Sequence, residues 1–299
     1  MNNPLLSVLP VILTFLTGYL LKRLNVFKKD DGDLLLKLVF YVGGPAIIFQ
    51  SLVSVKLNAD LLVYPLTGAI IMISSFIFAS LFEHSFKLPK ASRGVFMIAS
   101  MIVNTGFTLP FLLSTFGEIG VVRYSLFGLV ADTLVVSWVY AIACQHNPAN
   151  QSHKTIISKL FKSPPVWATV LGLMCNLLQL TPPDVVLAFA KNVGSIVGPL
   201  IMLSLGLYFQ PKIVRIAPTV GAILIRMLLG TTVAILITAF MGVTGVDRKI
   251  LILLAASPVG FNTITYSSLE NLDKELAASI VSISILIGLV LTPILLLFL

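Results

Sequence analysis

The chain has 299 residues, of which 57% are hydrophobic and only 11% are charged, and its formal net charge is +8. A soluble domain carries about 25% charged residues, so a chain this poor in charge cannot cover a water-facing surface. The basic residues gather in short loops between apolar runs, which is typical of membrane topology and gives no reason to expect a nucleic-acid partner.

The apolar runs predict an all-α polytopic protein of the lipid bilayer with ten transmembrane helices. The first run is followed, not preceded, by the basic residues Lys22 and Arg23, and no small-residue cleavage site comes after it, so we expect a retained helix and not a signal peptide. In chain order the expected spans are residues 4–21, 34–54, 61–82, 92–114, 119–143, 164–181, 185–209, 213–241, 248–268 and 274–298.

The loops that follow spans 1, 3, 5, 7 and 9 carry most of the Lys and Arg residues. Because cytoplasmic loops are enriched in these residues, both termini are predicted to lie outside the cytoplasm, in a multi-pass protein of the cell (inner) membrane. The hydrophilic, basic segment 144–163 is interpreted as a cytoplasmic linker between two halves.

The two halves align at a shift of about 155 residues. The matching positions are Pro10-Val11 with Pro165-Val166, Gly44-Pro45 with Gly198-Pro199, and Arg93 with Arg248. Residues 1–143 are then a first five-helix repeat and residues 164–299 a second. An odd number of spans per half inverts the second repeat in the membrane, a recurring plan of secondary transporters with the site at the midplane.

Spans 4 and 9, which occupy equivalent places in the two halves, both contain helix breakers beside polar residues. Proline cannot donate a backbone hydrogen bond and its ring crowds the preceding turn, so we expect a second half-helix to begin near Phe107 and another near Asn262. Such half-helix N-termini carry partial positive charge and suit a carboxylate; the alternative is that the kinks only shape packing. The residues expected to bind substrate here are Asn104, Thr105, Gly106, Thr108, Ser257, Asn262 and Thr263, with Pro110 and Pro258 as the breaks.

Two charged residues, Asp132 and Arg226, lie mid-span, where a charge should face protein or water and have a partner. Asp132 is a candidate proton or cation acceptor. Arg226 is a candidate anion contact or the charge partner of Asp132; a buried ion pair that only locks the scaffold is the alternative.

Gln50 follows the Gly43-Gly44-Pro45 kink and is expected either to line the cavity or to form a helix–helix hydrogen bond. The prolines of the two Gly-Pro pairs, Pro45 and Pro199, are predicted helix breaks and flex points.

In these residues the chain resembles the auxin efflux carrier family, in its bacterial branch, whose members include malonate-type carriers. The resemblance covers the whole chain and rests on the run ending at Lys22, on Gly43-Gly44-Pro45, on Asn104-Thr105-Gly106 with Leu109-Pro110, and on Ser257-Pro258 to Asn262-Thr263. It implies a ten-helix fold like that of the bile-acid and sodium–proton exchangers, with helices 4 and 9 crossing and a small organic acid bound at the crossover. Asn104 and Asn262 fall where the family's crossover asparagines lie. The chain lacks the long hydrophilic central loop of plant members, which favours a bacterial carrier.

The sequence therefore predicts a secondary active transporter of a small organic anion, in which spans 1, 2, 6 and 7 form one bundle and the other spans move against it. A channel and a non-transporting sensor of small acids are the alternatives. We expect no enzyme, because no H-E-x-x-H, G-x-S-x-G or P-loop pattern occurs. No cofactor or metal site is expected either, since Cys144 and Cys175 stand alone. Proton or sodium coupling and a homodimeric state stay open.

Overall fold

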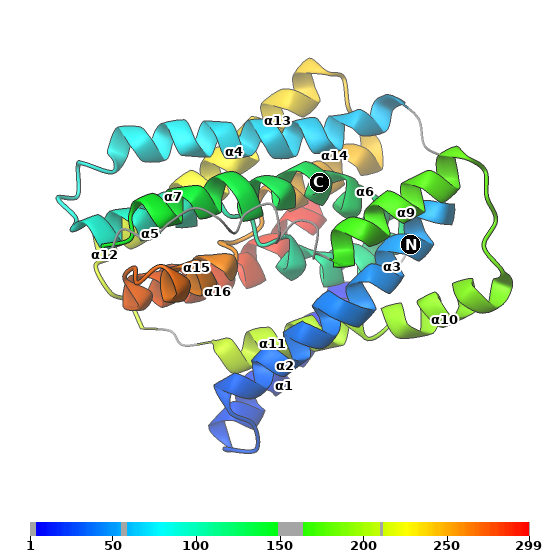
Figure 1. Ribbon diagram of the computed structural model, residues 1–299, viewed down its shortest axis with the longest axis horizontal. Coiled ribbons are helices and arrows are strands. Elements are labelled where there is room, and N and C mark those ends of the chain that lie inside the picture. Colours follow the sequence, from blue (N-terminus) through cyan, green and yellow to red (C-terminus); the bar gives the residue numbers. More distant parts are fainter. Residues whose placement is uncertain (1–3, 55–58, 149–163, 210–211, 299) are drawn as a thin grey trace. The chain divides into compact units, whose positions relative to one another are not determined.

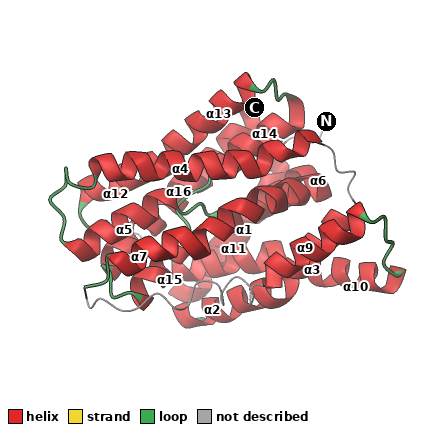
Figure 2. Cartoon of the chain, turned by 45° about the horizontal axis from the view of Figure 1, so that its top comes forward, coloured by secondary structure: helices red, strands yellow, loops and turns green. Residues whose placement is uncertain are grey.

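The computed structural model describes residues 4–54, 59–148, 164–209 and 212–298. Every regular element within these residues is a helix, as Figures 1 and 2 show, and the prediction of an all-α protein is confirmed. Within the described residues, Val103 and Val259 also form an isolated antiparallel β-bridge. Most of the predicted linker 144–163 lies outside the described residues.

Six helical segments in the described part of the chain are long and apolar enough to cross a membrane, so the chain is membrane-embedded. The predicted spans 92–114 and 248–268 are each divided by a break, and span 164–181 corresponds to the shorter apolar helix α9, Pro164–Leu177. The ten-helix count and the inverted repeat remain predictions. The six segments are Asp31–Ser54, Ala59–Phe82, Thr105–Gln145, Asp184–Tyr208, Ile216–Phe240 and Lys274–Phe298.

The first of two compact units comprises Met1–Val63, Gly106–Leu129 and Phe161–Phe209. It contains the predicted spans 1, 2, 6 and 7, which we expected to form one bundle, and also residues 106–129, parts of the predicted spans 4 and 5 that we expected in the other group. Its helices are α1 (Pro4–Arg23), α2 (Lys29–Leu38), α3 (Gly44–Ser54), α9, α10 (Asp184–Gly194) and α11 (Val197–Tyr208), together with part of α6 (Thr105–Leu134).

Helices α1 and α11, which are far apart in the sequence, lie side by side within the first unit (Figure 1). Their backbones approach closely because glycines face the partner helix on both sides. A Cβ atom added at Gly18 would collide with the backbone of Leu203, and one at Gly206 would collide with the carbonyl oxygen of Phe15. Small residues at such contacts are how membrane helices gain close packing.

The second unit comprises Tyr64–Thr105, Val130–Leu160 and Gln210–Leu299. Its long helices are apolar over much of their length, with serines and threonines that bond carbonyls of their own helix, as Ser100 does to Phe96. The helices are α4 (Val63–Phe82), α5 (Lys90–Met101), α7 (Tyr140–Gln145), α12 (Ile216–Ile223), α13 (Gly230–Phe240), α14 (Gly245–Ala255), α15 (Asn262–Leu269) and α16 (Lys274–Phe298).

Neither proline of the two Gly-Pro pairs breaks a helix at its own position. A π-helical turn, Val39–Gly43, precedes α3, and the N–H of Gly44 donates to the carbonyl of Val39. Pro45 therefore sits in the first turn of α3, where its missing N–H costs little. In the second half the interruption is at Ser195 and Ile196, and Pro199 lies in the first turn of α11.

The predicted spans 92–114 and 119–143 are not separated by a loop. Helix α6 runs from Thr105 to Leu134 and turns at Gly117, whose φ of 58° and ψ of −140° are not helical. Only glycine adopts this region without strain. A Cβ at Gly120 would lie 2.7 Å from the carbonyl oxygen of Leu112, so the two arms pack tightly after the turn.

We predict that Gly206→Ala destabilises the first unit by about 1–3 kcal/mol, because the added methyl meets fixed backbone atoms and not a flexible side chain. Thermal unfolding in detergent would measure the loss. Gly198→Ala in the same helix is the control, since its Cβ would come no closer than 3.8 Å to Pro110. Equal melting temperatures for the two variants would contradict the close α1–α11 approach.

Candidate substrate site at the two helix breaks

The first break separates α5 from α6. Helix α5 ends at Met101, Ile102 is extended (φ −74°, ψ 113°), and α6 begins at Thr105. The second half-helix thus starts two residues before the predicted Phe107. Two β-branched residues, Ile102 and Val103, begin the extended segment and are weak helix formers.

The second break separates α14, which ends at Ala255, from α15, which begins at Asn262, the residue expected from the sequence. Pro258 lies inside this break. It cannot donate to Leu254, and the carbonyl of Leu254 instead accepts from the N–H of Ser257 at 3.3 Å.

The two breaks pair with each other through an isolated antiparallel β-bridge between Val103 and Val259. The N–H of Asn104 donates to the carbonyl of Pro258 at 2.9 Å, and the N–H of Gly260 donates to the carbonyl of Ile102 at 2.9 Å. The side-chain amide of Asn104 also reaches the carbonyl of Val259 at 3.4 Å. We call these paired segments, residues 102–104 and 256–261, the crossover.

A close approach of the two backbones makes this pairing possible. A Cβ at Gly260 would lie 2.5 Å from Cγ2 of Ile102 and 3.1 Å from the carbonyl oxygen of Val103. The N–H of Val259 points the other way and donates to the hydroxyl of Ser284 in α16 at 3.0 Å. The non-helical backbone at this depth is thereby hydrogen-bonded inside protein, as a membrane interior requires.

Five of the predicted substrate residues lie in the second unit, at or beside the crossover: Asn104, Thr105, Ser257, Asn262 and Thr263. Four of these are buried, and Asn262 is exposed. The hydroxyl of Ser257 faces back along its own helix, toward the carbonyl of Leu253 at 3.4 Å.

The remaining predicted residues belong to the first unit. Gly106 and Thr108 are in the first turn of α6, where Thr108 is fully buried, and Pro110 lies inside this helix. The side-chain amide of Gln50 donates to Glu118 at 2.9 Å, which is the helix–helix hydrogen bond that the sequence analysis weighed against a cavity-lining role.

The N-terminus of α15 offers fewer backbone donors than a simple helix start. The N–H of Thr263 bonds the carbonyl of Gly260 at 3.1 Å, and that of Ile264 bonds Phe261 at 2.9 Å. The hydroxyl of Thr263, by contrast, is fully buried and has no hydrogen-bond partner among the described residues. With the exposed amide of Asn262 beside it, this half-helix end presents polar groups that are not used by the fold.

Arg226 lies in a π-helical turn, Leu224–Leu229, and its side chain is completely buried. Its Nη2 donates to the carbonyl oxygen of Ala255, the last residue of α14, at 2.7 Å. A Cβ at Gly230 would lie 2.7 Å from Nη1 of Arg226, so the glycine leaves room for the guanidinium.

Asp132 lies near the end of α6, in the second unit, and its side chain is exposed. In the part of the chain that the structure describes, it forms no ion pair with Arg226.

Sequence reasoning missed a buried carboxylate, Glu270, at the other end of α15. The hydroxyl of Tyr140 donates to its Oε1 at 2.6 Å, and the amide of Asn147 donates to its Oε2 at 3.0 Å. The rings of Tyr140 and Tyr266 are 5.0 Å apart. Because Glu270 follows an eight-residue helix without any periodic motif, no pattern marks it before the fold is known.

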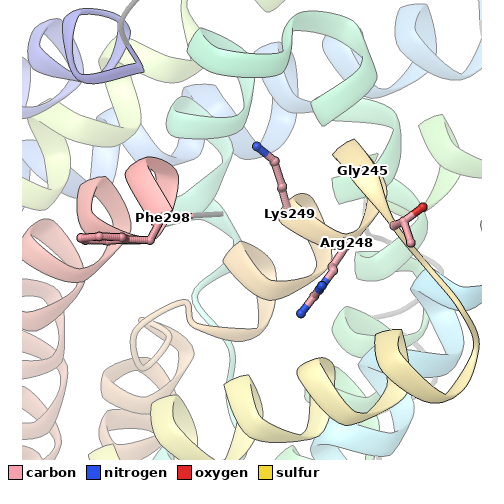
Figure 3. A pocket seen from close by; sticks show the side chains of 5 residues that line it. Gly245, Arg248, Lys249 and Phe298 are labelled. Carbon is pink, nitrogen blue, oxygen red and sulfur yellow. The ribbon is translucent and has the colours of Figure 1, made fainter.

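A cavity of about 220 Å³ lies at the first turn of α14 (Figure 3). This is the opposite end of α14 from the break, so the cavity is separate from the crossover. In Figure 3 the side chains of Arg248 and Lys249 extend to different sides of the helix. The lining residues are Thr244, Gly245, Arg248, Lys249 and Phe298.

The amino-acid sequence of the chain is similar to those of known proteins. Residues 5–296 match the family described as "Membrane transport protein". The chain belongs to this family. It is also similar to two proteins named as uncharacterised transporters. One, from Methanocaldococcus jannaschii, is 27% identical over 293 residues, covering 94% of each chain. The other, from Methanothermobacter thermautotrophicus, is 27% identical over 292 residues, covering 96% of this chain and 95% of the relative.

Membership of the membrane transport protein family confirms that the chain is a transmembrane transport protein. The match and the two relatives run across nearly the whole chain, as the predicted resemblance did. The crossover is therefore a structural feature within a transporter, and the residues gathered there are candidates for handling its substrate.

We predict that Gly260→Ala in this transporter lowers the free energy of unfolding by about 1–3 kcal/mol, because the methyl group would push apart the paired backbones. Ile102→Ala removes the nearest clashing atom. The double variant should consequently be less destabilised than the sum of the two single variants, and thermal unfolding of all three measures the coupling. Strict additivity would mean that the two breaks do not pack against each other.

Proposed function

We propose that the chain is a secondary active transporter of a small organic anion, a carboxylate such as malonate or an auxin-like acid. The substrate would bind at the crossover and move by alternating access. The single observation that carries this proposal is the start of α15, where the exposed amide of Asn262 adjoins the buried, unpartnered hydroxyl of Thr263.

Three properties of this half-helix end favour an anion. The N-terminus of a helix carries roughly half a positive charge. The groups beside it, an amide and a hydroxyl, donate hydrogen bonds and can bind a carboxylate without a metal. A buried polar group without a partner costs free energy, so a ligand that satisfies the Thr263 hydroxyl recovers that cost on binding.

The other predicted residues would take supporting parts. Asn104 would hold the crossover backbone next to the substrate, and Ser257 would bond the last turn of α14. Thr105, Gly106 and Thr108 would supply the start of the second half-helix, with Gln50 fixing the neighbouring helix through Glu118.

Alternating access would move the second unit against the first. The grouping of predicted spans 1, 2, 6 and 7 into one compact unit supports such a division. Pro258 would set the irregular backbone of the second break, and the interruptions just before Pro45 and Pro199 would be the flex points of the first unit.

The sequence also supports proposals on the subfamily, membrane orientation, coupling ion and oligomeric state. We propose that the transporter is of the bacterial, malonate-carrier type within the bile acid/sodium symporter-like superfamily. It would lie in the cell (inner) membrane with both termini outside the cytoplasm, work with a proton or sodium ion, and assemble as a homodimer.

The substrate class can be tested by thermal stabilisation of the purified protein with mono- and dicarboxylates. A ligand at 100 times its dissociation constant stabilises by about 2.7 kcal/mol, and we expect malonate or a related carboxylate to do so. Asn262→Ala should abolish the response, because it removes the exposed amide donors. Asn192→Ala, an exposed asparagine in α10, is the control and should respond like the native chain. No shift with any carboxylate would rule out the organic-anion assignment.

Uptake into proteoliposomes separates a transporter from the alternatives. A transporter should show saturable malonate uptake and counterflow, since the site must reorient for each turnover. Flux without saturation or counterflow would indicate a channel, and ligand binding without any flux would indicate a sensor.

If protons drive uptake, Asp132 is the proposed acceptor. Native uptake of malonate should increase when the outside is acidified, and Asp132→Asn should lose this increase, because an amide keeps the shape of the carboxyl group but cannot bind the proton. Asp184→Asn, at an exposed position in α10, serves as the control. An unchanged pH dependence in Asp132→Asn would refute the assignment.

A further inference from the structure

The crossover contains four half-helix ends whose partial charges oppose one another. Helices α5 and α14 end there, and α6 and α15 begin there. Each C-terminus carries roughly −0.5 and each N-terminus roughly +0.5 of an elementary charge. The four ends together therefore cancel, and the backbone alone gives an approaching anion no net advantage over a cation.

Arg226 breaks this balance. Its guanidinium bonds the carbonyl of Ala255, the final residue of α14, and so places a full positive charge at one of the two negative ends. Ala255 is three residues before Pro258, whose carbonyl accepts from Asn104 in the crossover. Position 71, which corresponds to 226 at the repeat shift of about 155 residues, is Ile71, so the end of α5 has no matching cation from the equivalent helix.

The burial of Arg226 indicates that its positive charge has a functional role in addition to its packing. The side chain is 0% exposed, and Nε and Nη1 have no hydrogen-bond partner among the described residues. A buried charge with unsatisfied donors is expensive, and charged residues inside a membrane protein usually serve function. A single carbonyl could be capped far more cheaply by a neutral donor.

We propose that Arg226 is a positioning residue that makes the electrostatic potential at the crossover positive, and so selects anions, without touching the substrate. It acts through the end of α14, whose negative partial charge it neutralises, so that the N-terminus of α15 dominates the field near Asn262. The inference rests on the proposed anion site at the crossover, and it assigns the charge selectivity of that site to one residue.

The potential can be measured without any substrate. Asn262→Cys puts a thiol at an exposed position beside the crossover. Its rates of modification by an anionic and a cationic methanethiosulfonate of similar size are compared in the purified chain, with peptide mass spectrometry to separate the introduced thiol from the native Cys144 and Cys175. The ratio of the two rates cancels the thiol's own ionisation and reports the local potential.

In this background Arg226→Gln should lower the anionic-to-cationic rate ratio by about fivefold, the effect of a unit charge acting at a partly solvated site. Arg226→Lys should restore the ratio, because it keeps the charge. Arg248→Gln removes an exposed arginine at the far end of α14 and should leave the ratio unchanged. A folded Arg226→Gln with the native ratio would overturn the proposal.

If Arg226→Gln does not fold, Arg226→Lys decides the matter. A buried lysine gives up its proton far more readily than an arginine. Raising the pH should then lower the rate ratio in Arg226→Lys and not in the native chain, and equal behaviour of the two would overturn the proposal. A shifted ratio in this background, together with no carboxylate binding to the native chain, would contradict the proposed substrate class and leave the role of Arg226 standing.

Discussion

The second unit depends on one constraint: a backbone that leaves the helix inside a membrane must find hydrogen-bond partners within the protein. Each break provides the partner of the other, through the N–H groups of Asn104 and Gly260 and the carbonyls of Pro258 and Ile102. The pairing satisfies backbone groups of both breaks at once, with Ser284 of α16 as a further partner for Val259. Gly260 is required by this arrangement, since any side chain there meets Ile102 and the backbone of Val103.

This pairing also divides the polar residues of the crossover by role. The amide of Asn104 and the hydroxyl of Ser284 bond the backbone of the second break, so they maintain the geometry. Asn262 and Thr263 lie just beyond the paired segment, where Asn262 is exposed and the Thr263 hydroxyl has no partner among the described residues. Two asparagines that look equivalent in the sequence are thus unequal in the fold, because Asn104 bonds the scaffold and Asn262 is exposed beside it.

The sequence was sufficient for features that depend on local chemistry. Apolar runs predicted the helical membrane class, and Pro258 followed by Asn262 predicted a second break whose following helix begins near Asn262, where α15 does begin. The first break was displaced toward Pro110, because a proline was assumed to mark the boundary; α6 instead begins at Thr105 and tolerates Pro110 within it. The turn at Gly117 and the π-helical turns depend on backbone dihedral angles, which a pattern of apolar residues does not specify. The carbonyl partner of Arg226 is 29 residues away and follows only from tertiary packing.

The short helix α15 shows what kind of motion the proposed transport cycle can use. An isolated helix of eight residues is not stable by itself. Its start is fixed by the crossover, it packs against α5 and α16, and its end is fixed where Glu270 accepts hydrogen bonds from Tyr140 and Asn147. A helix restrained at both ends cannot swing independently to expose or close a site. If the proposed alternating access occurs at the crossover, α15 would therefore have to move together with α5, α7 and α16, and not by a local hinge at the second break.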